Sequence, residues 1–368
     1  HRCYRNKITE RYLMSSRRGV EFVDLESGEN YQNHWVRSGC KVGNLPCNGL
    51  LFVAPHPCQC YIDAKLTGFN ALAPARKTDA QHQNPDTKDR PRRRLEQGPA
   101  YASVTGQTPP VPDPADWPTY RHDARRSGAT DSAVATQLDI TWRSDVGTTL
   151  SSPVVAGGKL FVADVDTHTV IALDAKTGLP AWKYTAGARV MSPPTIHAGL
   201  AIFGSADGRV YCLRASDGEM VWRFNAAPEH RLVTSFGQLE SAWPVPGVLV
   251  QDGLCWFAAG RCSFMDGGVY VYALDPLTGN MMHEKIVYSP DPETGKMTPE
   301  PNGQLMQGLL NYIPGSDGTS VFVRQMNFSS DAPANAKEHL YTTGGFLDSS
   351  WFNRTFWKIG RAQTTGPM

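Results

Sequence analysis

The sequence has almost no excess of charge of one sign and no long apolar run. Its 36 Lys and Arg residues nearly balance its 35 Asp and Glu residues, which gives a formal net charge of +1. A near-neutral chain argues against nucleic acid or an anionic membrane as a partner held by bulk electrostatics. No stretch of about eighteen apolar residues occurs, so the sequence predicts no membrane-spanning helix.

Several catalytic motifs are also missing. The chain contains no glycine-rich phosphate loop, no nucleophile elbow and no HExxH sequence, which leaves nucleotide hydrolysis, serine esterase and zinc protease activities without support. It has no CxxCH sequence for covalent haem. Helix-forming stretches are scarce, whereas 34 Gly and 27 Pro residues are present. This composition favours a turn-rich all-β chain.

What the sequence does have is an internal repeat with a period of forty residues. Trp142, Trp182 and Trp222 are forty positions apart, and Gly178 and Gly218 each precede the next tryptophan by four residues. Each copy contains short β-branched and aromatic runs, KLFVAD and HTVIALD in the first and LAIFGS and RVYCLR in the second. Two further strands fit around these runs. Four strands in about forty residues predict one blade of a β-propeller.

The recurring tryptophans have a structural role in this interpretation. One twisted sheet cannot bury both of its faces alone, so we expect each indole to pack on the next blade rather than on a ligand. A longer copy, GGVYVYALDPLTGNMMHEKIVY, has its turn at Gly279 and places His283 where the tryptophan would stand. Weaker copies towards both ends bring the expected number of blades to about six.

The phrases VIALDAKTGLPAW and VYCLRASDGEMVW resemble the repeat of the pyrroloquinoline-quinone (PQQ) type propellers. That superfamily includes quinoprotein alcohol dehydrogenases and the BamB-type outer-membrane assembly lipoprotein. The segments CNGLLFVAPHPCQCY, WPTYRHDARRSGAT, GQLESAWPVPG and FLDSSWFNRTFW are similar to the large PQQ-binding-like β-propeller repeat proteins of planctomycete-type bacteria. The resemblance implies an all-β propeller of four-stranded antiparallel blades.

The first residues, HRCYRNKITERY, show neither an initiator Met nor a secretion signal. We expect a mature product or an excerpt of a longer reading frame. If the eight blades usual in the family apply, the missing blades lie outside this chain. Within the chain we expect Cys-rich N-terminal blades over residues 1–75, a polar, Pro-rich insertion or linker over 76–116, and further PQQ-like blades over 117–368. The basic run RPRRR in the linker is interleaved with acidic residues, which favours a solvated loop.

The resemblance also raises a cofactor hypothesis. Quinoprotein alcohol dehydrogenases hold PQQ between a ring of two adjacent cysteines and a tryptophan, with a calcium ion that polarises the quinone and an Asp as base. This chain has no Cys-Cys dipeptide, and Cys58-Gln59-Cys60 is its nearest approach. We therefore predict no cofactor, and PQQ with Ca²⁺ belongs to the alternative of a quinoprotein oxidoreductase.

The sequence contains eight cysteines, which favours disulfides in a periplasmic or extracellular bacterial protein. Cys212 lies inside a strand and is expected to be a buried free thiol. Free thiols, or a metal site at His56, Cys58 and Cys60, are the alternatives for the others. A bridge between Cys255 and Cys262, at the two ends of CWFAAGRC, would join adjacent strand ends. The disulfide candidates are Cys3, Cys40, Cys47, Cys58, Cys60, Cys255 and Cys262.

We expect a ligand-binding site where the sequence departs from the repeat, because insertions in blades gather on one face of a propeller. The insertion APEHRLVTSFGQLESAWPVPG and two later segments concentrate carboxylates, guanidinium groups and indoles, which suit a carbohydrate or a peptide. The alternative is that these charges pair with each other and pin long loops across the propeller. The candidate ligand-binding residues are Glu229, His230, Arg231, Gln238, Glu240, Trp243, Arg261, Asp266, Asp348, Trp351 and Arg354.

These observations predict a non-catalytic, extracytoplasmic propeller that serves as a binding or assembly scaffold. Its ligand on the loop face would be a protein or a carbohydrate. The alternatives are the PQQ- and calcium-dependent oxidoreductase and a carbohydrate-binding or carbohydrate-processing module.

Overall fold

The computed structural model describes residues 5–15, 19–33, 35–55, 66, 68–74, 94–105, 110, 113–291, 293–296, 308–324, 326–328, 340–342 and 357–359. The secondary structure of this part is nearly all strand, with one short helix, α2 (Tyr101–Thr105). Apart from isolated bridges, the strand pairs are antiparallel. Among the described residues, no helix is long and apolar enough to cross a bilayer.

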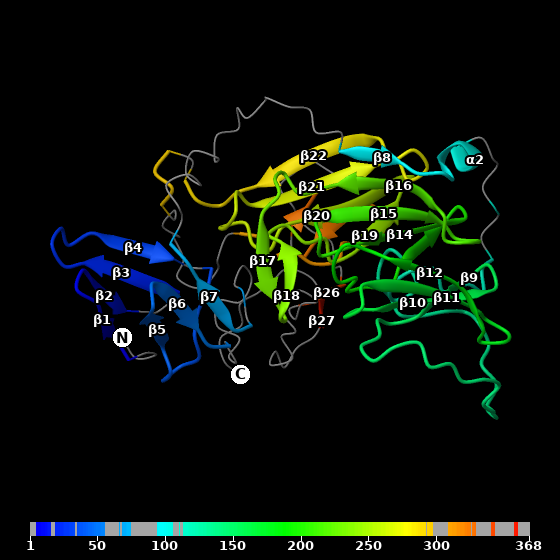
Figure 1. Ribbon diagram of the computed structural model, residues 1–368, viewed down its shortest axis with the longest axis horizontal. Coiled ribbons are helices and arrows are strands. Elements are labelled where there is room, and N and C mark those ends of the chain that lie inside the picture. Colours follow the sequence, from blue (N-terminus) through cyan, green and yellow to red (C-terminus); the bar gives the residue numbers. More distant parts are fainter. Residues whose placement is uncertain are drawn as a thin grey trace.

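Three sheets of the repeat region are meanders in which strands pair in sequence order (Figure 1). The first is formed by β9 (Val154–Ala156), β10 (Lys159–Asp164), β11 (Thr169–Asp174) and β12 (Pro180–Thr185). The second is formed by β13 (Thr195–His197), β14 (Leu200–Gly204), β15 (Arg209–Arg214) and β16 (Met220–Asn225). The third is formed by β19 (Val248–Gln251), β20 (Leu254–Ala259), β21 (Val269–Leu274) and β22 (Met281–Val287).

The remaining sheets flank these three blades. The N-terminal sheet consists of β1 (Lys7–Ile8), β2 (Tyr12–Ser15), β3 (Val20–Asp24) and β4 (Asn30–Asn33). Two three-stranded sheets are β5 (Asn44–Cys47), β6 (Leu50–Val53), β7 (Asn70–Leu72), and β23 (Gly315–Ser316), β24 (Val321–Val323), β25 (Met326–Asn327). Two-stranded sheets are β17 (Leu232–Ser235) with β18 (Gln238–Ser241), and β26 (Leu340–Thr342) with β27 (Trp357–Ile359). The predicted all-β propeller of four-stranded antiparallel blades is confirmed.

The turns before the outer strands of the first and third repeat blades follow from an Asp-x-x-x-Gly pattern, Asp174 to Gly178 and Asp275 to Gly279. The Asp174 side chain accepts hydrogen bonds from the backbone N–H groups of Lys176 and Thr177 and from the Thr177 hydroxyl. These bonds, the one from the Thr177 N–H foremost, lower the pKa of Asp174 because they favour the charged carboxylate. Gly178 then takes a φ of +70°, which glycine adopts at low cost. Local hydrogen bonds therefore shape this turn.

Each repeated tryptophan lies on the turn of the next blade. The Nε1 of Trp182 donates to the carbonyl of Ala215 at 3.1 Å, and that of Trp222 donates to Pro276 at 3.0 Å. Their rings lie against Gly218 and Gly279, where an added Cβ would come within 2.6 and 2.9 Å of an indole carbon. Trp142 makes the same contacts with Ala175 and Gly178. Glycine is thus required for the close approach of the ring.

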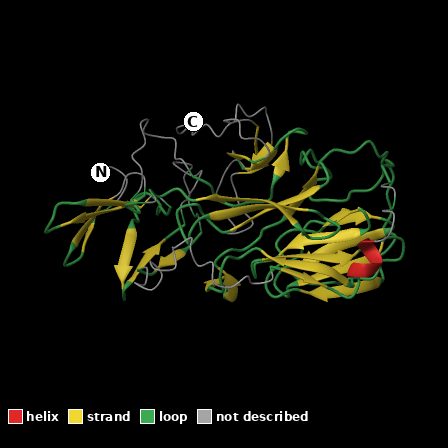
Figure 2. Ribbon diagram, turned by 90° about the horizontal axis from the view of Figure 1, so that it is seen from above, coloured by secondary structure: helices red, strands yellow, loops and turns green. Residues whose placement is uncertain are grey.

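Within the expected linker, the structure places a packed element. β8 (Leu95–Gln97) pairs antiparallel with the outer edge of β16 and makes that sheet five-stranded. Ala100 is buried, and α2 follows it against the same blade; it is the red helix of Figure 2. Residues 94–105 of the predicted insertion or linker are thus packed on this blade, because backbone pairing with β16 compensates for their lack of apolar periodicity. The division of the chain at 75 and 116 stays a prediction.

Arg126 links β19 to the segment that leads into β23. Its guanidinium donates to the carbonyls of Val248 at 3.0 Å, Pro314 at 3.0 Å and Tyr120 at 2.9 Å. A fourth bond goes to the Thr119 hydroxyl at 2.9 Å. The residue is buried, and burial lowers its pKa to about 10. At neutral pH the group therefore stays charged.

Candidate functional site

The insertion between β16 and β19 forms the β17–β18 hairpin, which crosses the blade strands at a steep angle (Figure 1). It contains or adjoins most of the predicted ligand-binding residues. Arg261 and Asp266, from the connection between β20 and β21, come to the same place. His230 precedes β17 and is exposed. Asp348, Trp351 and Arg354 lie outside the described residues.

One ion-paired cluster lies at the base of the hairpin. Arg231 donates to Glu229 at 3.0 Å and to Asp266 at 2.8 Å. Its guanidinium also lies over the ring of Trp243, 5.1 Å from the centroid. The Nε1 of Trp243 donates to the backbone carbonyl of Asp266 at 2.9 Å, and the indole is buried. The indole therefore holds the loop in place and offers no open ring face on which a sugar or a quinone could stack.

A second cluster lies beneath the hairpin and is almost fully buried. Glu240 contacts Arg189 through one carboxylate oxygen and Arg261 through the other, the latter at 2.8 Å. The side chains of Glu240, Arg189 and Arg261 are 0%, 5% and 14% exposed. A carboxylate shared by two guanidinium groups compensates the cost of burying all three charges. Glu240 thus anchors β18 to two loops of the propeller.

A third anchor joins the hairpin to the first repeat blade. Gln238 accepts a hydrogen bond from His168 at 2.5 Å and donates to the carbonyl of Asp166 at 3.1 Å. Both partners belong to the turn between β10 and β11. The hairpin is consequently fixed to the blades on either side of it.

The outer face of the hairpin carries large apolar side chains. In the antiparallel register Thr234 is opposite Leu239, and Leu232 lies on the same face two residues along β17. Leu232, Phe236 and Leu239 are 48%, 53% and 63% exposed. The opposite face carries Val233, which packs on the core, and Glu240. Two of the four strand residues on the outer face, Leu232 and Leu239, are therefore large apolar side chains exposed to solvent.

The turn of the hairpin keeps an aromatic ring at a strained position. Ser235 pairs with Gln238, and the two residues between them, Phe236 and Gly237, have φ angles of +51° and +76°. This is a two-residue turn in which Asn-Gly is the favoured sequence. A bulky residue with positive φ is uncommon and costs energy. The Phe236 ring lies 4.2 Å from the Arg189 guanidinium and so covers the buried ion cluster with one face.

Five of the predicted charged residues, Glu229, Arg231, Glu240, Arg261 and Asp266, therefore form ion pairs that hold loops of the described propeller together. Sequence reasoning missed Arg189, His168 and Phe236. Next to Phe236, the only local turn signal in the sequence is Gly237 between two short runs. Nothing in the local sequence marks Arg189 or His168, because their partners lie 51 and 70 residues away.

Where the structure describes them, the cysteines agree with the predictions in part. Cys255 is a free buried thiol in the cluster around Trp222, whereas Cys262 packs with Val36 and Leu66. The bridge between Cys255 and Cys262 is not formed, because the two side chains enter different clusters. Cys212 is a buried free thiol as predicted. Cys40 and Cys47 are exposed.

The remaining cysteines and the predicted metal ligands cannot be compared with the structure. Cys3, Cys58, Cys60 and His56 lie outside the described residues. No group of three His, Cys, Asp or Glu side chains that could hold a metal occurs within the described ranges.

Burial predicts a sharp difference in thiol reactivity. It raises the pKa of Cys255 to about 12 and that of Cys212 well above its usual range. Because the thiolate is the reactive form, we expect iodoacetamide at pH 8 to label Cys47 in the folded protein and to leave Cys212 and Cys255 unmodified. Mass spectrometry of peptides, with a urea-unfolded sample as control, measures this. Labelling of Cys255 at the rate of Cys47 would contradict the buried position.

Comparison with known proteins gives a family. A family model described as "Outer membrane protein assembly factor BamB" matches residues 131–324, which include the three repeat blades and the hairpin. The BamB outer membrane protein assembly factor of Nitrosomonas eutropha is 30% identical over 149 residues, covering 40% of this chain and 32% of the relative. That of Burkholderia pseudomallei is 32% identical over 83 residues, covering 23% of this chain and 22% of the relative. The chain thus spans about a third of the length of the first relative.

Solved structures resemble parts of the chain. A europium-containing methanol dehydrogenase aligns with a TM-score of 0.40 and 18% identity, over 52% of this chain and 34% of that one. BamB from Moraxella catarrhalis aligns with a TM-score of 0.26 and 16% identity, over 51% of this chain and 61% of that one. Because the family model matches more than half of the 368 residues, this protein belongs to the family of the outer membrane protein assembly factor BamB.

Proposed function

We propose that this protein is a protein-binding scaffold of the bacterial cell envelope, that it takes part in assembling outer membrane proteins, and that the β17–β18 hairpin is its recognition element. The assembly of outer membrane proteins is suggested by the names of the relatives. The hairpin would provide the surface that binds the partner protein.

The observation that carries this proposal is the exposed apolar face of the hairpin. Three large apolar side chains, Leu232, Phe236 and Leu239, project from one small element. Exposed apolar groups that gather in one place mark interaction sites in soluble proteins. Aromatic residues such as Phe236 are also enriched at the centres of protein interfaces.

The anchors beneath the hairpin support the same function. A recognition element binds more tightly when it does not have to be ordered on binding. The Glu240 and Gln238 contacts fix the hairpin to two loops and one blade turn before any partner arrives. The paired charges of the insertion, Glu229, Arg231 and Glu240, hold the hairpin and its loop in place. The outer face would then bind an apolar patch on a folded protein.

Phe236 gives a test that separates binding from stability. Because Asn adopts a positive φ more readily than Phe, we expect the Phe236→Asn variant to keep its free energy of unfolding within about 1 kcal/mol of the parent, with relieved turn strain offsetting the lost cation–π contact. Affinity for the partner should fall at least about tenfold, as for a central interface residue. A photo-crosslinking residue at Leu239 in the native host identifies the partner, and calorimetry measures its affinity.

The matched control is Val134, another large apolar residue that is highly exposed and belongs to the segment before β9. Crosslinks at Leu239 to an outer membrane protein or an assembly component, and none from position 134, would support the proposal. Equal crosslinking at both positions would contradict it. Reconstitution with PQQ and Ca²⁺ that gave a stoichiometric bound quinone would replace the scaffold with the oxidoreductase.

A further inference from the structure

The outer edge of the second repeat blade already holds an added strand. Residues 94–100 run along β16, with the Gly98 N–H donating to Val221 at 2.7 Å and the Asn225 N–H donating to Arg94 at 2.7 Å. The segment comes from more than 120 residues earlier in the chain. Addition of an extended segment to an open sheet edge is a general mode of peptide recognition. The outer edge of this blade therefore accepts an extended peptide in that mode.

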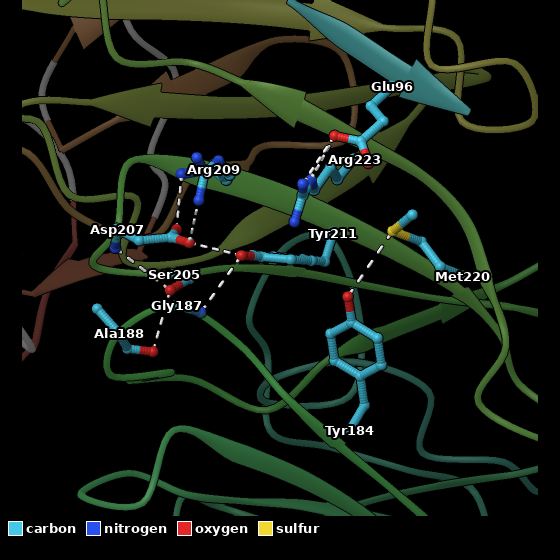
Figure 3. A network of polar contacts seen from close by, with 10 residues as sticks. All are labelled: Glu96, Tyr184, Gly187, Ala188, Ser205, Asp207, Arg209, Tyr211, Met220 and Arg223. Atoms are coloured by element: carbon cyan, nitrogen blue, oxygen red, sulfur yellow. Dashed lines mark hydrogen bonds and ion pairs between the residues drawn. The ribbon is translucent and has the colours of Figure 1, made fainter. Parts of the chain in front are cut away.

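Side chains give this added strand its specificity. Glu96 is directly opposite Arg223 in the register and pairs with it at 2.7 Å (Figure 3). Leu95 lies beside Gly279 and Trp222, where an added Cβ on the glycine would be 2.6 Å from the leucine. A Cβ on Gly98 would lie 2.1 Å from the Met220 carbonyl oxygen, so glycine is required there. The strand bound at this edge therefore has, over residues 95–98, an apolar residue, an acidic residue, a third residue without such a contact, and a glycine.

The first repeat blade presents the same edge forty residues earlier. β12 is the last strand of its sheet, and among the described residues no strand lies beyond it. Lys183 occupies the place of Arg223 and is exposed, and Trp182 against Gly218 repeats the arrangement of Trp222 against Gly279. The basic group and the apolar contact that hold β8 are therefore both present on β12.

The third repeat blade has an acidic residue where the second has Arg223. In β22, Glu284 stands at the place of Arg223, counted from the turn glycine, and it already pairs with Arg94 at 2.8 Å. An acidic strand would meet a carboxylate there, and like charges directly opposite each other are unfavourable. The charge pattern thus singles out β12.

We propose that the outer edge of β12 binds an extended segment of a partner protein by strand addition, and that this segment carries an acidic residue opposite Lys183, preceded by an apolar residue and followed two positions later by glycine. This surface is distinct from the β17–β18 hairpin, so it stands or falls independently of the function proposed above.

A charge exchange tests the proposal. The probe is a fluorescein-labelled, blocked peptide with the sequence RLEQGPA of residues 94–100, and its binding to the whole chain is followed by fluorescence anisotropy. We expect saturable binding, a loss of at least about threefold in affinity for the Lys183→Glu variant, and recovery when that variant meets the peptide carrying E96K. Lys183 is exposed, so the variant should fold, which circular dichroism checks.

Two further variants locate the binding. The Glu284→Lys variant should leave the affinity unchanged. Peptide binding that is abolished by Arg223→Glu and indifferent to Lys183→Glu would mean that the probe displaces β8 from β16, and this would overturn the proposal. Absence of saturable binding up to millimolar peptide, or equal affinity for the peptide and its E96K form, would overturn it as well.

Discussion

Replacing Glu240 by glutamine should lower the free energy of unfolding by about 3 to 5 kcal/mol, because it leaves two buried guanidinium groups without their shared counter-charge. The substitution keeps the size and shape of the side chain, so the effect is electrostatic. Glu240 is fully buried, and its partners Arg189 and Arg261 have little access to water. Urea unfolding followed by tryptophan fluorescence measures the change.

The Glu229→Gln variant is the matched control. Glu229 also pairs with an arginine, Arg231, but both side chains are about one-third exposed. Water and salt weaken such a pair, so its removal should cost less than about 1 kcal/mol. The loss at Glu240 should persist in high salt. Equal losses for the two variants, or none at Glu240, would contradict the assignment of the buried cluster as the anchor of the hairpin.

Hydrogen exchange shows where the destabilisation acts. If Glu240 mainly holds the hairpin, amides of β17 and β18 should lose protection before those of β14 and β15 do. The apolar outer face would then be presented on a mobile element. A variant that binds its partner weakly while its blades remain intact would connect the buried ion cluster to recognition.

The parts of the fold that the sequence predicts are those fixed by local patterns. The spacing of Trp142, Trp182 and Trp222 and the glycines before them predicts blades because each repeat contains its own four strands and turns. The Asp174 turn likewise forms from bonds within four residues. Such features need no knowledge of distant parts of the chain.

The features that the sequence does not predict depend on long-range pairing. β8 has three residues and no alternation of apolar and polar side chains, and only the open edge of β16 makes it a strand. The partners of Glu240 come from a preceding loop and a following one, so the composition of the insertion suggests a ligand site although its charges are satisfied internally. The exposed Leu232 and Leu239 become a surface only once the register of the hairpin is known.

Replacing Arg126 by methionine should cost the protein about 3 to 5 kcal/mol of stability, although it removes a buried charge that has no carboxylate hydrogen-bonded to it among the described residues. Exchanging a buried ion for an apolar group of similar volume is often harmless when its polar partners are exchanged as well. Here the partners are backbone carbonyls, which cannot be removed. Val248 begins β19 and Pro314 immediately precedes β23, and each carbonyl loses its bond to the guanidinium.

The neighbouring Arg125 is the matched control for Arg126, because its side chain is exposed. Arg125→Met should change stability by less than about 0.5 kcal/mol, as surface substitutions usually do. Arg126→Lys should recover only part of the loss, since a compact ammonium group cannot reach acceptors spread over three segments as a planar guanidinium does. Thermal and urea unfolding of the three variants rank them. If Arg126→Met proved as stable as the parent, the carbonyls would have to find other donors, and the inner strands would be held by packing and not by this one side chain.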